Sequence, residues 1–218
     1  MKKVYVVGTQ KHYADFINDV ELVDNITDAE IVIFTGGEDV DPSLYGEEKH
    51  RTTFSNKSRD LEEVEKWNKV STNQLVVGIC RGSQFTCVMN GGKLIQNCDN
   101  HAIYDTHIIV SRDNTAYDIT STHHQMQYPY NLDSSDYTIL YYSPRRSCYY
   151  EGSGIDLDII YDHVEPEIVK YHKKGNPICL AIQGHPEYMR KEAPVVIMLN
   201  ELINNTLQEI KNNNIKNL

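Results

Sequence analysis

The chain has 218 residues, of which 40% are hydrophobic and 24% are charged, and its formal net charge is −10. This length is enough for one domain with a buried core, and the mean hydropathy of −0.51 argues against a membrane-spanning protein. The acidic balance argues against binding to duplex nucleic acid, which requires clustered lysines and arginines. The five cysteines form no C-x-x-C pair, so the pattern predicts a reducing, cytoplasmic location with an unpaired thiol.

Buried strands alternate with helices in the first half of the sequence. Apolar runs and their spacing predict strands over residues 4–7, 30–34 and 74–79, and helices over residues 59–70 and from Cys80 to Gly91. Such alternation is typical of βαβ units, so we expect an α/β fold with a largely parallel sheet. Because neither an internal repeat nor a linker is visible, a single domain over residues 1–218 is predicted.

The second half carries weaker signals. Its β-prone segments are residues 137–142, 157–161, 168–171 and 178–183. A helix is predicted from residue 193 to about residue 210, and the Asn- and Lys-rich end is expected to fray. An exposed apolar strip on that helix would allow a homodimer.

The strongest local signal is the segment Val-Gly-Ile-Cys-Arg-Gly-Ser-Gln over residues 77–84. A buried strand leads into one polar nucleophile, Cys80, and a glycine follows two residues later, before a helix. This order is typical of a nucleophile elbow, a sharp turn that exposes the nucleophile at the sheet edge. The helix N-terminus would favour a thiolate and a developing oxyanion. On the elbow alone, Cys80 could equally be a small core residue.

A candidate base and its orienting group follow the last predicted strand. His185 and Glu187 are two residues apart, so in an extended segment their side chains would face the same side. The carboxylate could then hold the imidazole in one tautomer. Either residue alone would be an ordinary surface group, but with Cys80 they predict a nucleophile–base–acid constellation.

A glycine-rich turn follows the strand at residues 30–34. The free backbone N–H groups of Gly36 and Gly37 could complete an oxyanion hole beside the N–H of Arg81. A simple loop is the alternative interpretation. Asp39 and Asp41 in the same segment are interpreted as turn and cap residues and not as a catalytic pair.

Taken in order, these segments resemble the class I glutamine amidotransferase superfamily, whose members carry G-x-C-x-G-x-Q and a late H-P-E. Within it, the γ-glutamyl hydrolase and γ-glutamyl-GABA hydrolase branch is the most similar. The motifs that carry this resemblance are residues 36–42 with 44–46, Arg59-Asp60, residues 79–82 and Ser121-Thr122-His123-His124-Gln125. The resemblance implies a flavodoxin-like three-layer sandwich and a catalytic triad of Cys80, His185 and Glu187.

The resemblance also implies further site residues. The oxyanion hole would be formed by the backbone N–H groups of Gly37 and Arg81. Gln84 matches a position that helps to hold the glutamyl α-amino and α-carboxylate groups, and the loop His123-His124-Gln125 matches one that lines the same pocket. No cofactor and no metal are implied. The adjacent histidines could suggest a metal site, but neighbouring side chains diverge and no H-x-x-x-H spacing accompanies them.

Two positions depart from the pattern of this branch. Ser83 stands where Met or His is common, and Gly184 stands where a bulky aromatic residue is frequent. Both flank the predicted site, so they bear on the leaving group and not on the triad.

The implied reaction is hydrolysis of a γ-glutamyl amide through a γ-glutamyl thioester on Cys80. The alternative is a glutaminase subunit that delivers ammonia from glutamine to a separate ligase or synthetase partner. A non-enzymatic binding module is a third hypothesis, and the complete triad argues against it.

Overall fold

Two adjacent parallel strands, β4 (Leu75–Ile79) and β13 (Ile178–Ile182), form the centre of the computed structural model, which describes residues 1–144, 146–152 and 164–216. Within these residues, nine strands form one sheet in the order β2-β1-β3-β4-β13-β12-β10-β7-β8. The remaining strands of this sheet are β1 (Lys2–Val6), β2 (Val20–Leu22), β3 (Ile31–Phe34), β7 (Ala102–Val110), β8 (Ala116–Thr122), β10 (Tyr137–Ser143) and β12 (Glu165–Tyr171).

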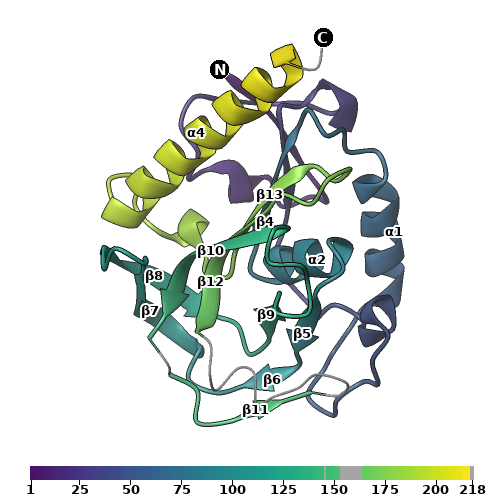
Figure 1. The fold of residues 1–218 in the computed structure, drawn as a ribbon, viewed down its shortest axis with the longest axis vertical. Helices are drawn as coiled ribbons and strands as arrows, with labels where there is room; N and C mark the ends of the chain where they lie inside the picture. Colours follow the sequence, from purple (N-terminus) through teal and green to yellow (C-terminus); the bar gives the residue numbers. More distant parts are fainter. Residues whose placement is uncertain (145, 153–163, 217–218) are drawn as a thin grey trace.

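The sheet is parallel from β2 to β13 and antiparallel from β13 to β8. The α/β prediction with a parallel central region is therefore confirmed, and the far part of the sheet adds antiparallel strands. Two small ribbons lie below the sheet in Figure 1: β5 (Lys93–Ile95) with β9 (Met126–Tyr128), and β6 (Asn97–Cys98) with β11 (Tyr150–Glu151).

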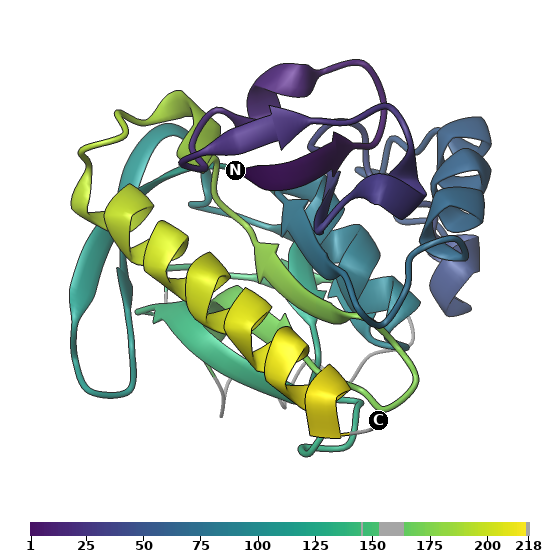
Figure 2. The same ribbon diagram turned by 90° about the horizontal axis from the view of Figure 1, so that it is seen from above.

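Helices cover both faces of the sheet. The long helix α4 (Pro194–Lys216) lies on one face, and α1 (Lys57–Trp67) and α2 (Arg81–Met89) lie on the other, as Figures 1 and 2 show. The turns η1 (Lys11–Ala14), η2 (Ile26–Asp28), η3 (Pro42–Tyr45) and η4 (Pro186–Tyr188) are short 3-10 helices. This arrangement is the predicted three-layer sandwich.

Each face has its own apolar core. On the α4 side, Val196, Leu199 and Ile203 pack with sheet residues such as Ile79 and Ile182. The other core contains aromatic side chains of three elements, Phe34, Trp67 and Phe85. The apolar periodicity of α4 therefore reflects packing against the sheet, whereas in α1 Trp67 is buried and Leu61 is 53% exposed.

The second half differs from the sequence-based expectation in two respects, and one predicted strand is not tested. The sequence did not predict the hairpin β7–β8, because its many exposed residues interrupt the apolar pattern. Ile109 and Ile119 are its fully buried residues in the core on the α4 side. The predicted strand over residues 157–161 lies outside the described residues. Helix α4 continues to Lys216 instead of fraying after residue 210.

The predicted apolar strip on α4 is largely used by the core, because most of its apolar side chains are buried against the sheet. Ile197 and Ile215 are the large hydrophobic residues of α4 that are exposed in the described chain. The homodimer stays a prediction. No helix among the described residues is both long and apolar enough to span a bilayer.

Candidate active site

Cys80 stands between β4 and the first residue of α2, in a strained backbone conformation with φ of 52° and ψ of −111°. Its N–H donates to the carbonyl of Ile182 at 2.8 Å, and its carbonyl accepts from the Ser83 hydroxyl at 2.7 Å. A positive φ is unfavourable for a non-glycine residue and is maintained only where the surroundings demand it. The predicted elbow is thus a sharp turn that places the thiol at the N-terminus of α2.

Two glycines make this turn sterically feasible. A Cβ on Gly78 would lie 2.4 Å from the carbonyl oxygen of Gly82, and a Cβ on Gly82 would lie 2.0 Å from the carbonyl oxygen of Phe34. Both contacts are with backbone atoms, which cannot rotate away. The helix therefore approaches the sheet closely only because these positions lack side chains.

The last central strand brings His185 and Glu187 to the same edge as Cys80. His185 Nδ1 lies 2.6 Å from Glu187 Oε1, and both side chains are buried. Their juxtaposition comes from η4, a tight 3-10 turn, and not from the extended segment that the sequence suggested. The backbone of His185 is held by β8, because its N–H donates to the Thr120 carbonyl at 3.1 Å.

His185 is bonded on both sides of its ring. Burial lowers the pKa of the imidazole, but hydrogen bonds to Cys80 and Glu187 outweigh this and raise its pKa to about 10. The ring is therefore an imidazolium at neutral pH. Tyr188 stacks on it with ring centroids 4.9 Å apart, and Tyr13 lies on a second side with a centroid distance of 6.3 Å.

The glycine turn after β3 lies against this group. A Cβ on Gly36 would be 3.2 Å from His185 Cε1 and 2.6 Å from the Tyr13 hydroxyl, so this backbone lies directly beside the base. Gly37 has φ of 135°, a value that favours glycine. Within the described chain, neither the Gly37 nor the Arg81 amide donates to a protein acceptor. Both remain available to an oxyanion.

Arg59 fixes the shape of that turn. Its guanidinium donates to the Gly36 carbonyl at 2.8 Å and to the Thr35 carbonyl at 3.3 Å. The same group pairs with Glu38 at 2.8 Å and with Glu63 at 2.9 Å. The glycine turn is thus connected to helix α1.

Helix α1 is connected in turn to the residue after the nucleophile. The Arg81 guanidinium is 2% exposed and pairs with the carboxylates of Asp60 and Glu63. Asp60 Oδ2 also accepts the N–H of Asp41 at 2.9 Å. One polar network therefore joins the two peptide segments that carry the candidate oxyanion donors.

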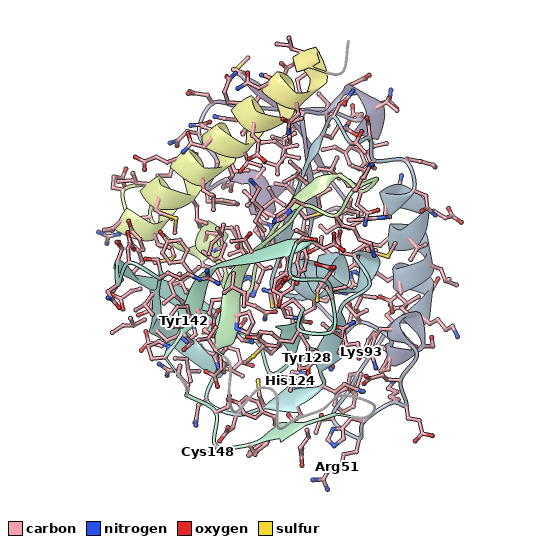
Figure 3. The ribbon with its side chains drawn as sticks, in the orientation of Figure 1. Arg51, Lys93, His124, Tyr128, Tyr142 and Cys148 are labelled. Carbon is pink, nitrogen blue, oxygen red and sulfur yellow. The ribbon has the colours of Figure 1, made fainter. Side chains whose placement is uncertain are left out.

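The predicted substrate-binding residues fall into two groups. The side chains of Gln84, His123 and Gln125 are buried and bonded internally: Gln84 Nε2 donates to the Gln125 carbonyl at 3.0 Å, and Gln125 Nε2 donates to the Thr53 hydroxyl at 3.1 Å. His124 is about one third exposed and reaches the glycine-turn segment, with Nε2 3.1 Å from Asp39 Oδ1. Figure 3 labels His124 near Tyr128.

The neighbouring histidines do diverge, as expected from sequence. His124 points to Asp39, whereas His123 Nε2 lies 3.6 Å from a buried carboxylate oxygen of Glu167. The partners of His123 come from other strands, so no local spacing could reveal them. Among the described residues, His101, His123 and Glu167 are the group whose geometry could hold a metal ion.

Position 184 has no room for a side chain. A Cβ on Gly184 would lie 2.7 Å from the Thr120 carbonyl oxygen and 2.6 Å from Ile119 Cγ1. The hairpin strand β8 fills the space that an aromatic side chain would need. Ser83 is also buried, and its hydroxyl lies 3.1 Å from Gln183 Oε1.

Sequence reasoning missed several residues around the thiol. Tyr13 and Tyr188 flank His185, and nothing in their local pattern indicates this. The motif Arg59-Asp60 carries a family resemblance, but its sequence alone assigns it no role. Asp41 is a cap residue, as interpreted, because its side chain accepts the Ser43 N–H at η3. Asp39 instead accepts the Phe54 N–H at 2.8 Å and contacts His124.

Known structures share this fold. A protein described as a GMP synthase subunit from Thermoplasma acidophilum superposes with a TM-score of 0.60 at 14% identity, over 100% of this chain and 98% of that one. A glutamine amidotransferase from Thermotoga maritima gives a TM-score of 0.51 at 13% identity, over 96% and 94% of the two chains. The fold is therefore that of class I glutamine amidotransferase-like proteins.

Sequence comparison identifies the family. Residues 13–132, more than half of the chain and including Cys80, match the model of peptidase C26. A protein described as glutamine amidotransferase-like, the YvdE homolog of Lactococcus lactis subsp. cremoris, is 38% identical over 82 residues, which span 37% of this chain and 40% of that protein. The chain belongs to the peptidase C26 family, within the class I glutamine amidotransferase-like superfamily.

Proposed function

We propose that this chain hydrolyses γ-glutamyl amides, with Cys80 as nucleophile, His185 as acid and base, and Glu187 as the group that orients His185. The observation that carries the proposal is the buried His185–Glu187 pair, joined at 2.6 Å, at the sheet edge that also carries Cys80 at the elbow; Cys80 and Glu187 together raise the pKa of His185 to about 10. An imidazolium beside a cysteine favours the thiolate, which is the attacking form.

The reaction has two balanced steps. In the first, the Cys80 thiolate attacks the amide carbonyl carbon, the C–N bond breaks, and the His185 imidazolium donates its proton to the departing nitrogen. In the second, water attacks the thioester carbonyl, neutral His185 accepts a proton from the water, and the C–S bond breaks. The products are glutamate and an amine, and the thiolate–imidazolium pair is restored.

The negative charge of each tetrahedral intermediate needs donors that are oriented before the reaction. The amides of Gly37 and Arg81 are free within the described chain, and the Arg59–Glu63–Arg81 network supports both segments. Donors of this kind contribute on the order of 10²–10³-fold in rate each. We assign the oxyanion hole to these two amides.

His124 is the predicted substrate-binding side chain that is accessible. Its contact with Asp39 puts a donor and a carboxylate beside the glycine turn, where they could bind the charged α-substituents of a glutamyl group. Gln84 and Gln125 would act indirectly, because their side-chain nitrogens already donate to protein acceptors.

A glutaminase that passes ammonia to a partner is the second candidate. It is favoured by the relative from Lactococcus lactis, which is described as glutamine amidotransferase-like. The two candidates share the thioester and differ in what leaves and where it goes. A partner ligase or synthetase would then be needed for full activity.

The test is intact-protein mass spectrometry after brief incubation with 6-diazo-5-oxonorleucine, a glutamine-shaped electrophile. One adduct should form per chain, map to Cys80, and be absent in Cys80→Ala and strongly slowed in His185→Ala. Cys148→Ala is the matched control, because Cys148 is the exposed cysteine of the chain and lies at the periphery in Figure 3. This variant should label like the wild type.

Turnover of glutamine and of larger γ-glutamyl amides then separates the candidates. Release of amines from the larger amides by the isolated chain supports the hydrolase. Release of ammonia from glutamine that rises sharply only with a partner supports the glutaminase. Labelling that persists in Cys80→Ala would overturn both.

A further inference from the structure

A second cluster of titratable side chains lies away from the thiol and takes no part in the proposed reaction. Its members are His101, His107, His123, Glu165 and Glu167, all 3% exposed or less. They come from the residue before β7, from β7 itself, from the connection between β8 and β9, and from β12. Burying five ionisable groups together is unfavourable unless each is compensated.

The inner atoms of the cluster converge on one carboxylate oxygen. Glu167 Oε1 lies 3.2 Å from His101 Nδ1, 3.2 Å from His107 Nε2 and 3.6 Å from His123 Nε2. The ligand atoms of His101, His123 and Glu167 all lie within 4.8 Å of one another. Around a tetrahedral Zn²⁺ with bonds of about 2.0–2.1 Å, neighbouring ligand atoms are roughly 3.3–3.4 Å apart.

These inner atoms lack hydrogen-bond partners within the described part of the chain. His101 Nδ1, His123 Nε2, both ring nitrogens of His107 and both oxygens of Glu167 are buried, and none forms a hydrogen bond of acceptable geometry. Buried polar atoms in native proteins are nearly always satisfied, so a group of them aimed at one point indicates a missing cation.

The outer ring nitrogens of His101 and His123 are, by contrast, well bonded. His123 Nδ1 lies 2.9 Å from the Gln125 carbonyl oxygen, which can only accept, so Nδ1 carries the hydrogen and Nε2 of the neutral ring presents a lone pair. Metal-binding histidines almost always donate their other N–H to a carbonyl or a carboxylate.

His101 has the same arrangement with a carboxylate. Its Nε2 lies 3.1 Å from Glu165 Oε2, and Glu165 also accepts the Ser147 N–H at 2.9 Å and the Tyr150 hydroxyl at 2.7 Å. Glu165 is thus fixed as an acceptor that orients His101. The Nδ1 of His101 is left facing Glu167.

We propose that His101, His123 and Glu167 bind one divalent transition-metal ion of the zinc type. Zinc is bound by imidazole nitrogens and carboxylate oxygens, and a set of two histidines and one glutamate is an established zinc ligand set. The ion would join the segment that leads into β7, the β8–β9 connection and β12. The sequence-based expectation of no metal overlooked this set, because His101 and Glu167 are 22 and 44 residues from His123.

The site would also stiffen the candidate active site. The Gln125 carbonyl that holds His123 accepts from Gln84 Nε2 of α2 and from Gln183 Nε2 at 3.2 Å. The Glu167 carbonyl accepts the Gln183 N–H at 2.8 Å, two residues before His185. The metal proposal does not rest on the proposed function, however, because its ligands do not include the thiol.

The experiment uses the full chain carrying Cys80→Ala and no affinity tag, so that neither the thiol nor a tag can bind metal. Metal is removed with a chelator, and zinc sulfate is then titrated against a chromogenic competitor. We expect one equivalent of Zn²⁺ per chain. The melting temperature should rise by about 5–10 °C when free zinc is 100 times its Kd.

Variants locate the ion. His123→Asn and Glu167→Gln should each bind less than about one tenth of an equivalent under the same conditions, and Glu165→Gln should weaken binding by about 10–100-fold. The control is His172→Asn, which alters a histidine outside the cluster, near Thr138, and should bind like the parent protein.

A second measurement does not depend on whether the cluster variants fold. X-ray absorption of the zinc-loaded Cys80→Ala chain should show only nitrogen and oxygen ligands, with the scattering pattern of histidine rings. A sulfur ligand, failure of the stripped chain to bind one equivalent, or unchanged binding in His123→Asn would each overturn the proposal. Because the chain tested is catalytically disabled, its outcome is independent of whether γ-glutamyl amides are the substrate.

Discussion

Glu187 controls the charge and the orientation of His185, the ring beside the candidate nucleophile. Its carboxylate lies 2.6 Å from His185 Nδ1 and is one of the groups that raise the pKa of His185 to about 10. Tyr13 and Tyr188 exclude water from two sides of the ring. Burial raises the pKa of the Tyr13 hydroxyl, so it stays neutral beside Glu187 and cannot act as a competing anion.

Substitution of Glu187 tests this arrangement. Glu187→Gln should lower kcat/KM by about 10²–10⁴-fold, because the amide neither orients nor stabilises the imidazolium. The carboxylate is one of the groups that raise the His185 pKa to about 10, so its loss should move the alkaline limit of activity to lower pH. A pH profile of hydrolysis or of Cys80 alkylation measures this shift.

The control is Glu192→Gln, which removes the same charge from an exposed position five residues later. It should leave the profile unchanged. An alkaline limit that is the same in Glu187→Gln and in the wild type would contradict the role given to Glu187.

Buried ion pairs connect helices α1 and α2. Arg81 at the start of α2 pairs with Asp60 and Glu63 of α1, and Arg59 extends the network to the glycine turn. A buried ion pair adds little net stability compared with apolar packing, but removal of one partner leaves a buried charge uncompensated. The network therefore specifies how α1, α2 and the turn are positioned.

Asp60→Asn should accordingly destabilise the protein. The free energy of unfolding should fall by about 3 kcal/mol, because Arg81 loses one of its two carboxylates in a buried site. Urea unfolding at neutral pH measures the change. Glu62→Gln, an exposed neighbour on the same helix, should change stability by less than about 0.5 kcal/mol. Equal effects of the two substitutions would show that the network has no special role.

At the scale of the molecule, two apolar cores enclose the sheet, and α4 alone covers much of one face (Figure 2). The side chains of this helix that face the sheet are buried, whereas Ile197 is 49% exposed. The stability of the central strands β4 and β13, which position Cys80 and His185, thus depends partly on the packing of α4.

Truncation on each side of α4 separates core packing from surface contact. Leu199→Ala should lower the free energy of unfolding by about 2–5 kcal/mol, because Leu199 is fully buried and its loss leaves a cavity. Ile197→Ala should change it by less than about 0.5 kcal/mol if the chain is monomeric. Thermal unfolding at two protein concentrations makes the measurement. A large, concentration-dependent effect of Ile197→Ala would instead reveal the predicted dimer.

Local sequence patterns determined the parallel half of the fold and the chemistry at its edge. Strands β1, β3, β4 and β13 are short apolar runs in the sequence. Gly78 and Gly82 at the elbow are needed because a side chain at either position would collide with a backbone carbonyl. The order Cys80, then His185 and Glu187, therefore predicted a nucleophile with a base. The sequence could not predict the 3-10 turn η4 that brings His185 and Glu187 together, because an extended segment and a 3-10 turn would both place these two side chains on the same side.

Only the tertiary structure decided which distant residues meet. The hairpin β7–β8 has a mixed polar and apolar pattern. The local sequence therefore could not predict that this hairpin packs over residue 184. Nor could it predict that His107 and the preceding His101 join a buried cluster. Residues such as Arg59, Asp60 and Glu167 carry ordinary surface charges in the sequence. Their roles arise from burial beside charged groups of other elements, since an interaction between distant residues depends on the folded distance and not on their spacing in the chain.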